Sequence, residues 1–250
     1  MSVKDHPSAG QGPRATVVFD NYRYDRRLAT GWGFAAVIDG LEKAILFDTG
    51  SDGGILLSNL SALDIRPDSI DVVFLSHIDD DHTGGLMEFL DKNPSVKVYL
   101  PSSFPSSFKS SVARACAEMV EVRGATSIFD GAFTTGELEG TKTEQALVLD
   151  LGGSIAVISG CAHPGIDRLV KAAIDIAGAK DVLILGGFHF FRSDTHSIIA
   201  MIRKLRELGV RWAAPTHCSG DEGRRLFREE YDGHYIEVGI GKTIDLSGLD

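Results

Sequence analysis

The feature that most constrains this chain is the run His-Ile-Asp-Asp-Asp-His at positions 77–82. Residues 71–75, directly before it, form a nearly continuous apolar run, as is typical of a strand buried on both faces of a sheet. Leu86, Phe89 and Leu90, shortly after it, are spaced like the inward face of a helix. The sequence therefore places a dense group of imidazoles and carboxylates where a buried strand gives way to a helix.

This run predicts a metal site. In an extended chain alternate residues point the same way, so His77, Asp79 and Asp81 are expected to converge. His82 would point elsewhere and serve a second ion, and Asp80 would be solvated or cap the helix. Neighbouring carboxylates repel one another unless a cation neutralises them, and mixed imidazole and carboxylate ligands suit zinc, manganese or iron. The alternative, an acidic loop that only caps a helix, leaves the two histidines unexplained.

Composition indicates a globular protein that acts on small molecules. The length of 250 residues suits one large domain or two small ones. The net charge of −10 argues against a nucleic-acid partner, and no apolar run is long enough to span a membrane. Residues 1–14 are polar without the apolar core of a signal peptide, so we expect a flexible N-terminal arm, a single domain over 15–250 and a cytoplasmic location. The oligomeric state is left open.

Short β-branched segments alternate with amphipathic stretches along the chain. The expected strands are 15–19, 34–38, 43–47, 71–75, 96–100, 146–149, 154–159, 182–185 and 212–214. Asp39-Gly40 predicts a tight hairpin between the second and third strands. Besides the helix after His82, the expected helices are 166–174 with Gly178 as its C-cap, 198–205 closed by Gly209, and an exposed one over 220–230. Early hairpins followed by strand–helix alternation predict two packed sheets covered by helices.

The run at 77–82, with the Thr-Gly-Gly-Leu that follows it, resembles the His-x-His-x-Asp-His signature of the metallo-β-lactamase superfamily. Residues 46–50 (Leu-Phe-Asp-Thr-Gly), 159–165 (Ser-Gly-Cys-Ala-His-Pro-Gly) and 215–220 (Pro-Thr-His-Cys-Ser-Gly) resemble its other motifs in the same order. Together with Gly-Gly-Phe-His-Phe at 186–190, the residues of these motifs are most similar to those of the branch named after dihydropterin–ribofuranosyl-aminobenzene phosphate synthase. The resemblance extends from about Val17 onward. Five separated motifs in order are a specific signal for a fold and a weak one for a substrate.

The resemblance implies an α/β (α+β) chain folded as an αββα sandwich, with two packed mixed β-sheets, flanking helices and a site in the loops at the sheet edges. It implies that His77 and His163 hold one divalent ion, while Asp81, His82 and His217 hold a second. Zinc is the favoured ion, with manganese or iron as alternatives. A metal-bound hydroxide would attack a small, anionic molecule, because a bound ion lowers the pKa of water to about 7. A phosphate ester, a phosphodiester, a lactone or a pterin-linked phosphate would fit.

The sequence departs from the signature in two places. Asp79 stands where the second histidine is usual; a carboxylate can still bind there, and would favour harder ions such as manganese or iron. We favour binding over a displaced Asp79 because its side chain should point the same way as that of His77. No aspartate occupies the expected bridging position, at the end of the strand 182–185. His189, which follows that strand, is therefore a substitute ligand or, in the favoured interpretation, an acid/base group facing the substrate.

Three further residues lie beside these motifs. Asp48 is expected to orient the metal loop through hydrogen bonds to its ligands. Cys161 and Cys218 could touch a metal or act as oxidation-sensitive thiols, but small buried residues that fill space are the favoured interpretation. The three cysteines are widely spaced and contain no Cys-x-x-Cys pair, so a disulfide framework and a thiolate zinc knuckle are both excluded.

Two loops are candidates for contact with a substrate. Arg23 and Arg26 could bind an anionic group such as phosphate, although a solvated loop with charges of both signs is equally consistent. Residues 102–108, rich in serine, are expected to form a flexible lid. Two alternatives to a hydrolase stay open: an iron-dependent redox or oxygen-using enzyme, suggested by Asp79, and a degenerate metal-binding module.

Overall fold

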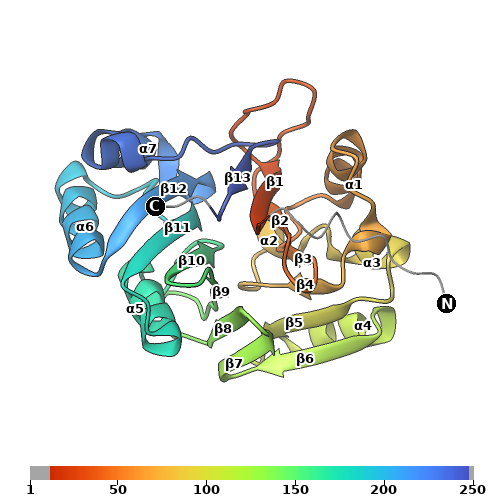
Figure 1. Ribbon diagram of the computed structural model, residues 1–250. Helices are drawn as coiled ribbons and strands as arrows, with labels where there is room; N and C mark the ends of the chain where they lie inside the picture. The colour runs from red at the N-terminus through yellow and green to blue at the C-terminus, as the bar shows by residue number, and fades with distance from the viewer. Residues whose placement is uncertain (1–11, 248–250) are drawn as a thin grey trace.

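Two mixed β-sheets lie face to face in the computed structural model, which describes residues 12–247 (Figure 1). The first sheet has the order β13-β1-β2-β3-β4-β5-β6. Its pairs from β13 to β3 are antiparallel and those from β3 to β6 are parallel. The strands are β1 (Arg14–Asp20), β2 (Phe34–Asp39), β3 (Ile45–Phe47), β4 (Val72–Phe74), β5 (Lys97–Pro101), β6 (Glu118–Val122) and β13 (Thr243–Asp245).

The second sheet has the order β12-β11-β10-β9-β8-β7. The pairs from β7 to β10 are antiparallel, whereas β10, β11 and β12 run parallel. The strands are β7 (Gly124–Phe129), β8 (Ala132–Gly136), β9 (Leu147–Asp150), β10 (Ser154–Ser159), β11 (Asp181–Gly187) and β12 (Val210–Thr216). Both sheets thus contain a block of parallel strands, and the carboxyl ends of such strands are where side chains from successive loops can meet.

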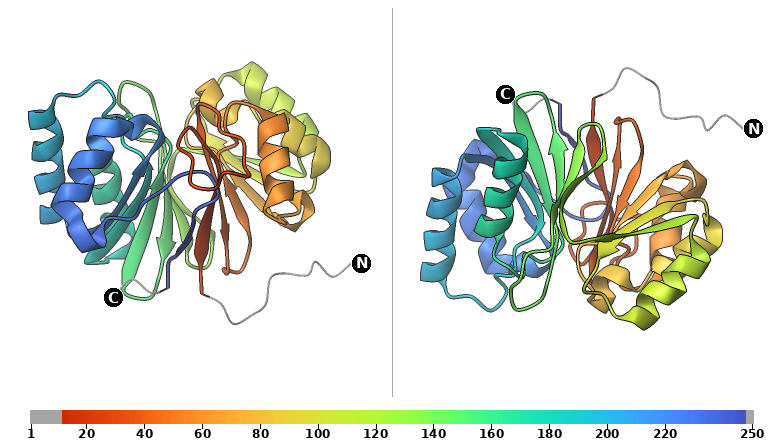
Figure 2. Two further views of the ribbon diagram at one scale, coloured as in Figure 1. Left: turned by 90° about the horizontal axis from the view of Figure 1, so that it is seen from above. Right: turned by 90° about the horizontal axis from the view of Figure 1, so that it is seen from below.

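Helices cover the outer face of each sheet (Figure 2). The first sheet carries α1 (Gly53–Ala62), α3 (Leu86–Lys92) and α4 (Ser106–Ala115), and the second carries α5 (Ile166–Ala177), α6 (Thr195–Glu207) and α7 (Gly220–Tyr231). Short helical turns are α2 (Asp80–Thr83), η1 (Pro67–Ser69), η2 (His217–Ser219) and η3 (Asp232–His234). None of the helices in the described part of the chain is long and apolar enough to cross a membrane.

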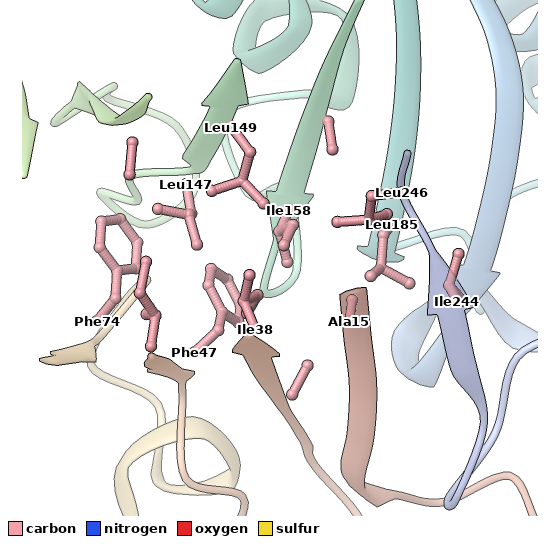
Figure 3. Close-up of a cluster of buried hydrophobic side chains, with 14 of the residues drawn as sticks. Ala15, Ile38, Phe47, Phe74, Leu147, Leu149, Ile158, Leu185, Ile244 and Leu246 are labelled. Carbon is pink, nitrogen blue, oxygen red and sulfur yellow. The ribbon is translucent and has the colours of Figure 1, made fainter. Parts of the chain in front are cut away.

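Three apolar clusters follow from this layering. The central one lies between the sheets and joins side chains such as Phe47 and Phe74 of the first sheet to Leu147 and Ile158 of the second (Figure 3). The other two lie between each sheet and its helices. Strands such as β4 therefore bury both faces, which explains their nearly continuous apolar sequence. The predicted αββα sandwich with two mixed sheets is confirmed.

The predicted strands and helices are all present, but three details differ. The turn between β2 and β3 is not tight, since residues 40–44 separate the two strands. Residues 102–108 are not a flexible lid: Phe104 is buried in the cluster under α4, and Ser106 begins that helix. The predicted N-terminal arm over 1–14 does not extend to Arg14, which begins β1 and pairs with Asp39 at 2.9 Å; residues 1–11 lie outside the described part.

Candidate metal centre

The six residues at 77–82 span the passage from β4 to the short helix α2. β4 ends at Phe74, Asp79 is the N-cap of α2, and Asp80 begins the helix with its side chain exposed. The extended alternation therefore stops at Asp79. The expectation that Asp81 points with His77 is wrong, because the chain has already turned helical there. Asp81 instead lies with His82, as the family resemblance implied.

The first of two donor groups, trio 1, consists of His77, Asp79 and His163. The Asp79 Oδ2 lies 3.6 Å from the Nε2 atoms of both histidines. Both of these Nε2 atoms are buried, and neither has a hydrogen-bond partner within the described residues. A buried nitrogen without a hydrogen-bond partner destabilises the fold unless something else binds it. A cation bound by these two nitrogens and the Asp79 carboxylate would provide that partner. Trio 1 can hold a divalent ion.

The second group, trio 2, consists of Asp81, His82 and His217. The Asp81 Oδ2 lies 3.3 Å from His217 Nε2 and 3.9 Å from His82 Nε2. Burial, followed by the charges of His77 and His217, holds the pKa of His82 well below its usual value. Burial opposes the ionisation of Asp81, but the contacts with His217 and His82 outweigh it and lower its pKa to about 2. A neutral imidazole beside a carboxylate is the state that binds a cation.

The second ring nitrogen of each of these four histidines, Nδ1, is also hydrogen-bonded. The Nδ1 partners are Ser76 Oγ for His77 (2.9 Å), Asp48 Oδ2 for His82 (2.7 Å), Thr141 Oγ1 for His163 (3.2 Å) and Asn21 Oδ1 for His217 (2.8 Å). Such outer partners fix the ring orientation, so that each Nε2 points inward. Asp48, which is fully buried and also accepts from Ser76 N–H and Oγ, lies where the sequence places an orienting residue.

Glu144 is a buried residue of this site that the sequence did not single out. Its Oε1 accepts hydrogen bonds from the backbone N–H groups of Gly160, Cys161 and Ala162, and its Oε2 accepts from that of His163. One carboxylate thus shapes the whole loop that carries His163. The only available signal was an acidic residue two positions before the predicted apolar strand 146–149, which is a common arrangement at strand ends.

Both trios open into a cavity of about 570 Å³. Trp32, Phe191, Lys142 and His189 line it together with four of the donor residues, Asp79, Asp81, His163 and His217. Lys142 Nζ pairs with Asp79 Oδ1. The positively charged side chain at the opening of the cavity is therefore a lysine that the sequence did not indicate. Arg23 and Arg26 are exposed and do not line the cavity; Arg23 contacts its own loop at Arg26 O and Thr30 Oγ1. The prediction that these two arginines bind a substrate is not supported by their position.

His189 and the two cysteines close the cavity from the second sheet. His189 adopts a left-handed φ of 58°, uncommon for a residue other than glycine, and its ring centroid lies 4.6 Å from that of His163. Its position is compatible with either predicted role. Cys161 and Cys218 are 4% and 2% exposed, as expected of residues that fill space, but Cys161 Sγ also lies 3.3 Å from His82 Nε2.

The donors come from both halves of the sandwich. His77, Asp79, Asp81 and His82 follow β4 of the first sheet, while His163 follows β10 and His217 follows β12 of the second. Two facing sheets with outer helices and a histidine–aspartate cluster at the ends of their parallel strands define an αββα protein whose cluster can hold divalent metal.

Comparison with known proteins agrees with this class. Residues 33–217 match the metallo-beta-lactamase superfamily, so the chain belongs to that superfamily. It is 29% identical to 7,8-dihydropterin-6-methyl-4-(beta-D-ribofuranosyl)-aminobenzene-5'-phosphate synthase of Methanocaldococcus jannaschii, over 82% of this chain and 85% of the relative. The predicted family, and the expected likeness to the synthase that names the branch, are both confirmed.

Solved structures show the same fold. Tm1679, described as a metal-dependent hydrolase of the beta-lactamase superfamily, superposes with a TM-score of 0.78 at 24% identity, covering 94% of this chain and 99% of the other. A diphosphatase from the PhnP family superposes with a TM-score of 0.59 at 13% identity, covering 94% and 98%.

Proposed function

We propose that this protein is a metal-dependent hydrolase that binds two divalent ions and acts on a small molecule bearing phosphate. Trio 1 would hold one ion and trio 2 the other. The observation that carries this proposal is the convergence of six nitrogen and oxygen ligand atoms in two groups that each reach the same cavity, with the Nε2 atoms of His77 and His163 buried and without partners among the described residues. A cavity of about 570 Å³ suits a small organic molecule.

Bound divalent ions would supply water with a pKa lowered to about 7 and would stabilise negative charge on the reacting group. The protein's own residues would position the reaction. Asp48 holds His82 in one orientation, and Asp81, at the cavity, would act as a ligand that also orients the attacking water. His189, which also lines the cavity, would exchange a proton with the substrate's leaving group.

Two observations favour a phosphate-bearing substrate over a lactone. Lys142 Nζ lies at the cavity mouth, where it can leave Asp79 for a more strongly charged oxygen of a substrate. The synthase relative is named for a compound with a 5'-phosphate on a ribofuranosyl group, and the PhnP-family structure is that of a diphosphatase. Trp32 and Phe191, with ring centroids 6.3 Å apart at the same mouth, would contact the organic part of the molecule.

Zinc is the ion proposed for trio 2. The carboxylate in trio 1 also suits manganese or iron, and this single feature favours a second candidate, an iron-dependent redox enzyme on the same fold. Metal analysis of protein purified without added metal separates the possibilities. About two equivalents of zinc or manganese support the hydrolase, whereas iron with visible absorbance supports the redox enzyme. Less than about half an equivalent of any metal indicates a degenerate module.

Two substitutions test the assignment of trio 2. His82→Ala and His217→Ala should each remove one equivalent of metal and abolish hydrolysis in a screen of phosphomonoesters, phosphodiesters and lactones. His196→Ala, an exposed histidine of α6, is the matched control and should retain both. Full turnover in either trio 2 variant would contradict a dinuclear mechanism.

A further inference from the structure

The sulfur of Cys161 occupies a position that its role as a space-filling residue does not require. Its Sγ lies 3.3 Å from His82 Nε2, and this sulfur and one ring nitrogen each of His77 and His82 lie within 4.8 Å of one another. His77 belongs to trio 1 and His82 to trio 2. Cys161, which itself lines the cavity, therefore contacts a ligand of trio 2 and lies close to a ligand of trio 1.

The backbone around Cys161 leaves room for this arrangement. Ser159, Gly186 and Pro215 are in register at the ends of β10, β11 and β12, so Cys161 and Cys218 follow the two strands that flank β11. A Cβ added at Gly187, the last residue of β11, would lie 2.6 Å from Cys218 Sγ and 2.3 Å from Gly160 O. The end of β11 thus contributes no side chain, the Cys218 thiol occupies the space where one would stand, and the Cys161 sulfur lies within 4.8 Å of it.

The loop that carries Cys161 is fixed. The backbone N–H groups of Cys161 and of both neighbours donate to the buried Glu144 Oε1 at 3.0–3.1 Å. A ligand held on a rigid loop keeps its donor atom in place before the ion arrives. Cys218 differs, because its Sγ already accepts the N–H of His189 at 3.3 Å, and its possible ligand group joins it to Cys161 and His189 and not to His77 or His82.

We infer that Cys161 is a metal ligand whose sulfur lies between trio 1 and trio 2 and binds the ions that both trios hold. The inference rests on the proposed metal function and adds a sulfur donor to a set of imidazoles and carboxylates. On binding, the thiol gives up its proton to solvent and a metal–sulfur bond forms. Sulfur ligands select zinc over hard ions such as manganese, so Cys161 counteracts the preference that Asp79 introduces.

Cobalt(II) is the probe for this bond, because a cobalt–thiolate bond gives a near-ultraviolet charge-transfer band. Wild-type protein loaded with cobalt should show the band, and Cys161→Ser should lose it and bind cobalt at least about tenfold more weakly, since even outer-shell partners of a metal contribute 10–100-fold. Cys218→Ser, an equally buried neighbour, and Cys116→Ser, on the distant α4 side of the first sheet, should keep the band. A band that survives in Cys161→Ser, or that disappears only in Cys218→Ser, overturns the inference.

Two further outcomes separate this inference from the proposed function. Wild-type protein that binds two cobalt ions without a thiolate band overturns the role of Cys161 and leaves the dinuclear site standing. Protein that binds no cobalt overturns both. If Cys161→Ser does not fold, cadmium-113 NMR of the wild type decides the matter: resonances shifted to the high-frequency range of sulfur ligation support the inference, and resonances typical of only nitrogen and oxygen ligands contradict it.

Discussion

Glu144 shows how one buried carboxylate can shape a site without touching the substrate. It is fully buried, and its negative charge is stabilised by the hydrogen bonds that it accepts from backbone N–H groups. Burial opposes its ionisation, but the charge of His77 and these N–H groups lower its pKa below the usual value. The loop that carries Cys161 and His163 therefore depends on a negative charge at this position.

Replacing this carboxylate should destabilise the protein. Glu144→Gln keeps one acceptor oxygen and turns the other into a donor that faces N–H groups, so we expect a loss of about 1–3 kcal/mol in the free energy of unfolding. Denaturation by guanidinium chloride measures it. Glu139→Gln, at an exposed position nearby, should change stability by less than about 0.5 kcal/mol. Equal stability of the two variants would show that Glu144 is not required to hold the loop.

Lys142 is the residue on which the choice of substrate depends. Removing its ammonium group from the cavity mouth should raise KM for a phosphate-bearing substrate by about tenfold, the effect of one lost charge-assisted contact. KM for a lactone should change little. Steady-state kinetics of Lys142→Ala on both substrates, with the exposed Lys180→Ala as control, provides the comparison. A similar loss on the lactone would mean that Lys142 acts through Asp79 and not through the phosphate.

For individual residues, the sequence indicated which side chains come together at the site, but it predicted their relative directions less accurately. The predicted residues from Asp48 to His217 converge because their motifs all follow parallel strands. The position of Asp81 was predicted wrongly from strand alternation, since the helix α2 begins one residue after Asp79. Glu144 and Lys142 could not be found, because nothing local marks a residue whose partners lie in a loop elsewhere in the chain.

Among the secondary-structure elements, the end of β11 is the one that tolerates the least change. Gly186 has a φ of 120°, and a Cβ there would lie 2.0 Å from the backbone oxygen of Ser159. β10 and β11 approach each other closely at this point, which lies directly beneath the loops that carry the donors. Any side chain would push the two strands apart.

Gly186→Ala should therefore cost about 3 kcal/mol or more, the sum of left-handed backbone strain and a clash with neighbouring backbone. Gly178→Ala is a matched comparison. It also has a positive φ, at the C-terminus of α5, but nothing lies within 4 Å of the added carbon, so it should cost only about 1 kcal/mol. Thermal unfolding of both variants measures the difference. Equal losses would show that the contact with β10 is unimportant.

Helices and strands in which apolar residues recur at regular spacing were predicted from the sequence, and those without such spacing were not. α5 shows a clear stripe with a glycine C-cap and was identified almost to its ends. α1 begins with two glycines and α4 contains four serines, so neither has the composition of a good helix. Four of the six residues of β7 are exposed, so this edge strand lacks the alternation that marks a half-buried strand.

For the whole molecule, each trio joins the two sheets, because it takes donors from loops of both. An ion bound by either trio should hold the halves of the sandwich together. At free metal about a hundredfold above its dissociation constant, one ion adds about 2.7 kcal/mol, which raises the melting temperature of a chain of this size by roughly 5–10 °C.

This stabilisation should depend on pH in a defined direction. Protons compete with metal for imidazole nitrogens, so the rise in melting temperature should be full at pH 7.5 and should shrink as the pH falls below about 6. Differential scanning calorimetry with zinc, and with a chelator as control, tests this at both pH values. A rise that is independent of pH would show that the ion is bound without the histidines.

The sharing of donors between the two sheets also has a consequence for biosynthesis. His77 leaves the ribosome long before His163 and His217, so a nascent chain lacks part of trio 1 until residue 163 is made and part of trio 2 until residue 217 is made. If both trios bind metal as proposed, the second ion is therefore bound only when most of the chain has been made. A product of synthesis stalled between residues 163 and 217 would carry the acidic run at 77–82 with a complete trio 1 and an incomplete trio 2.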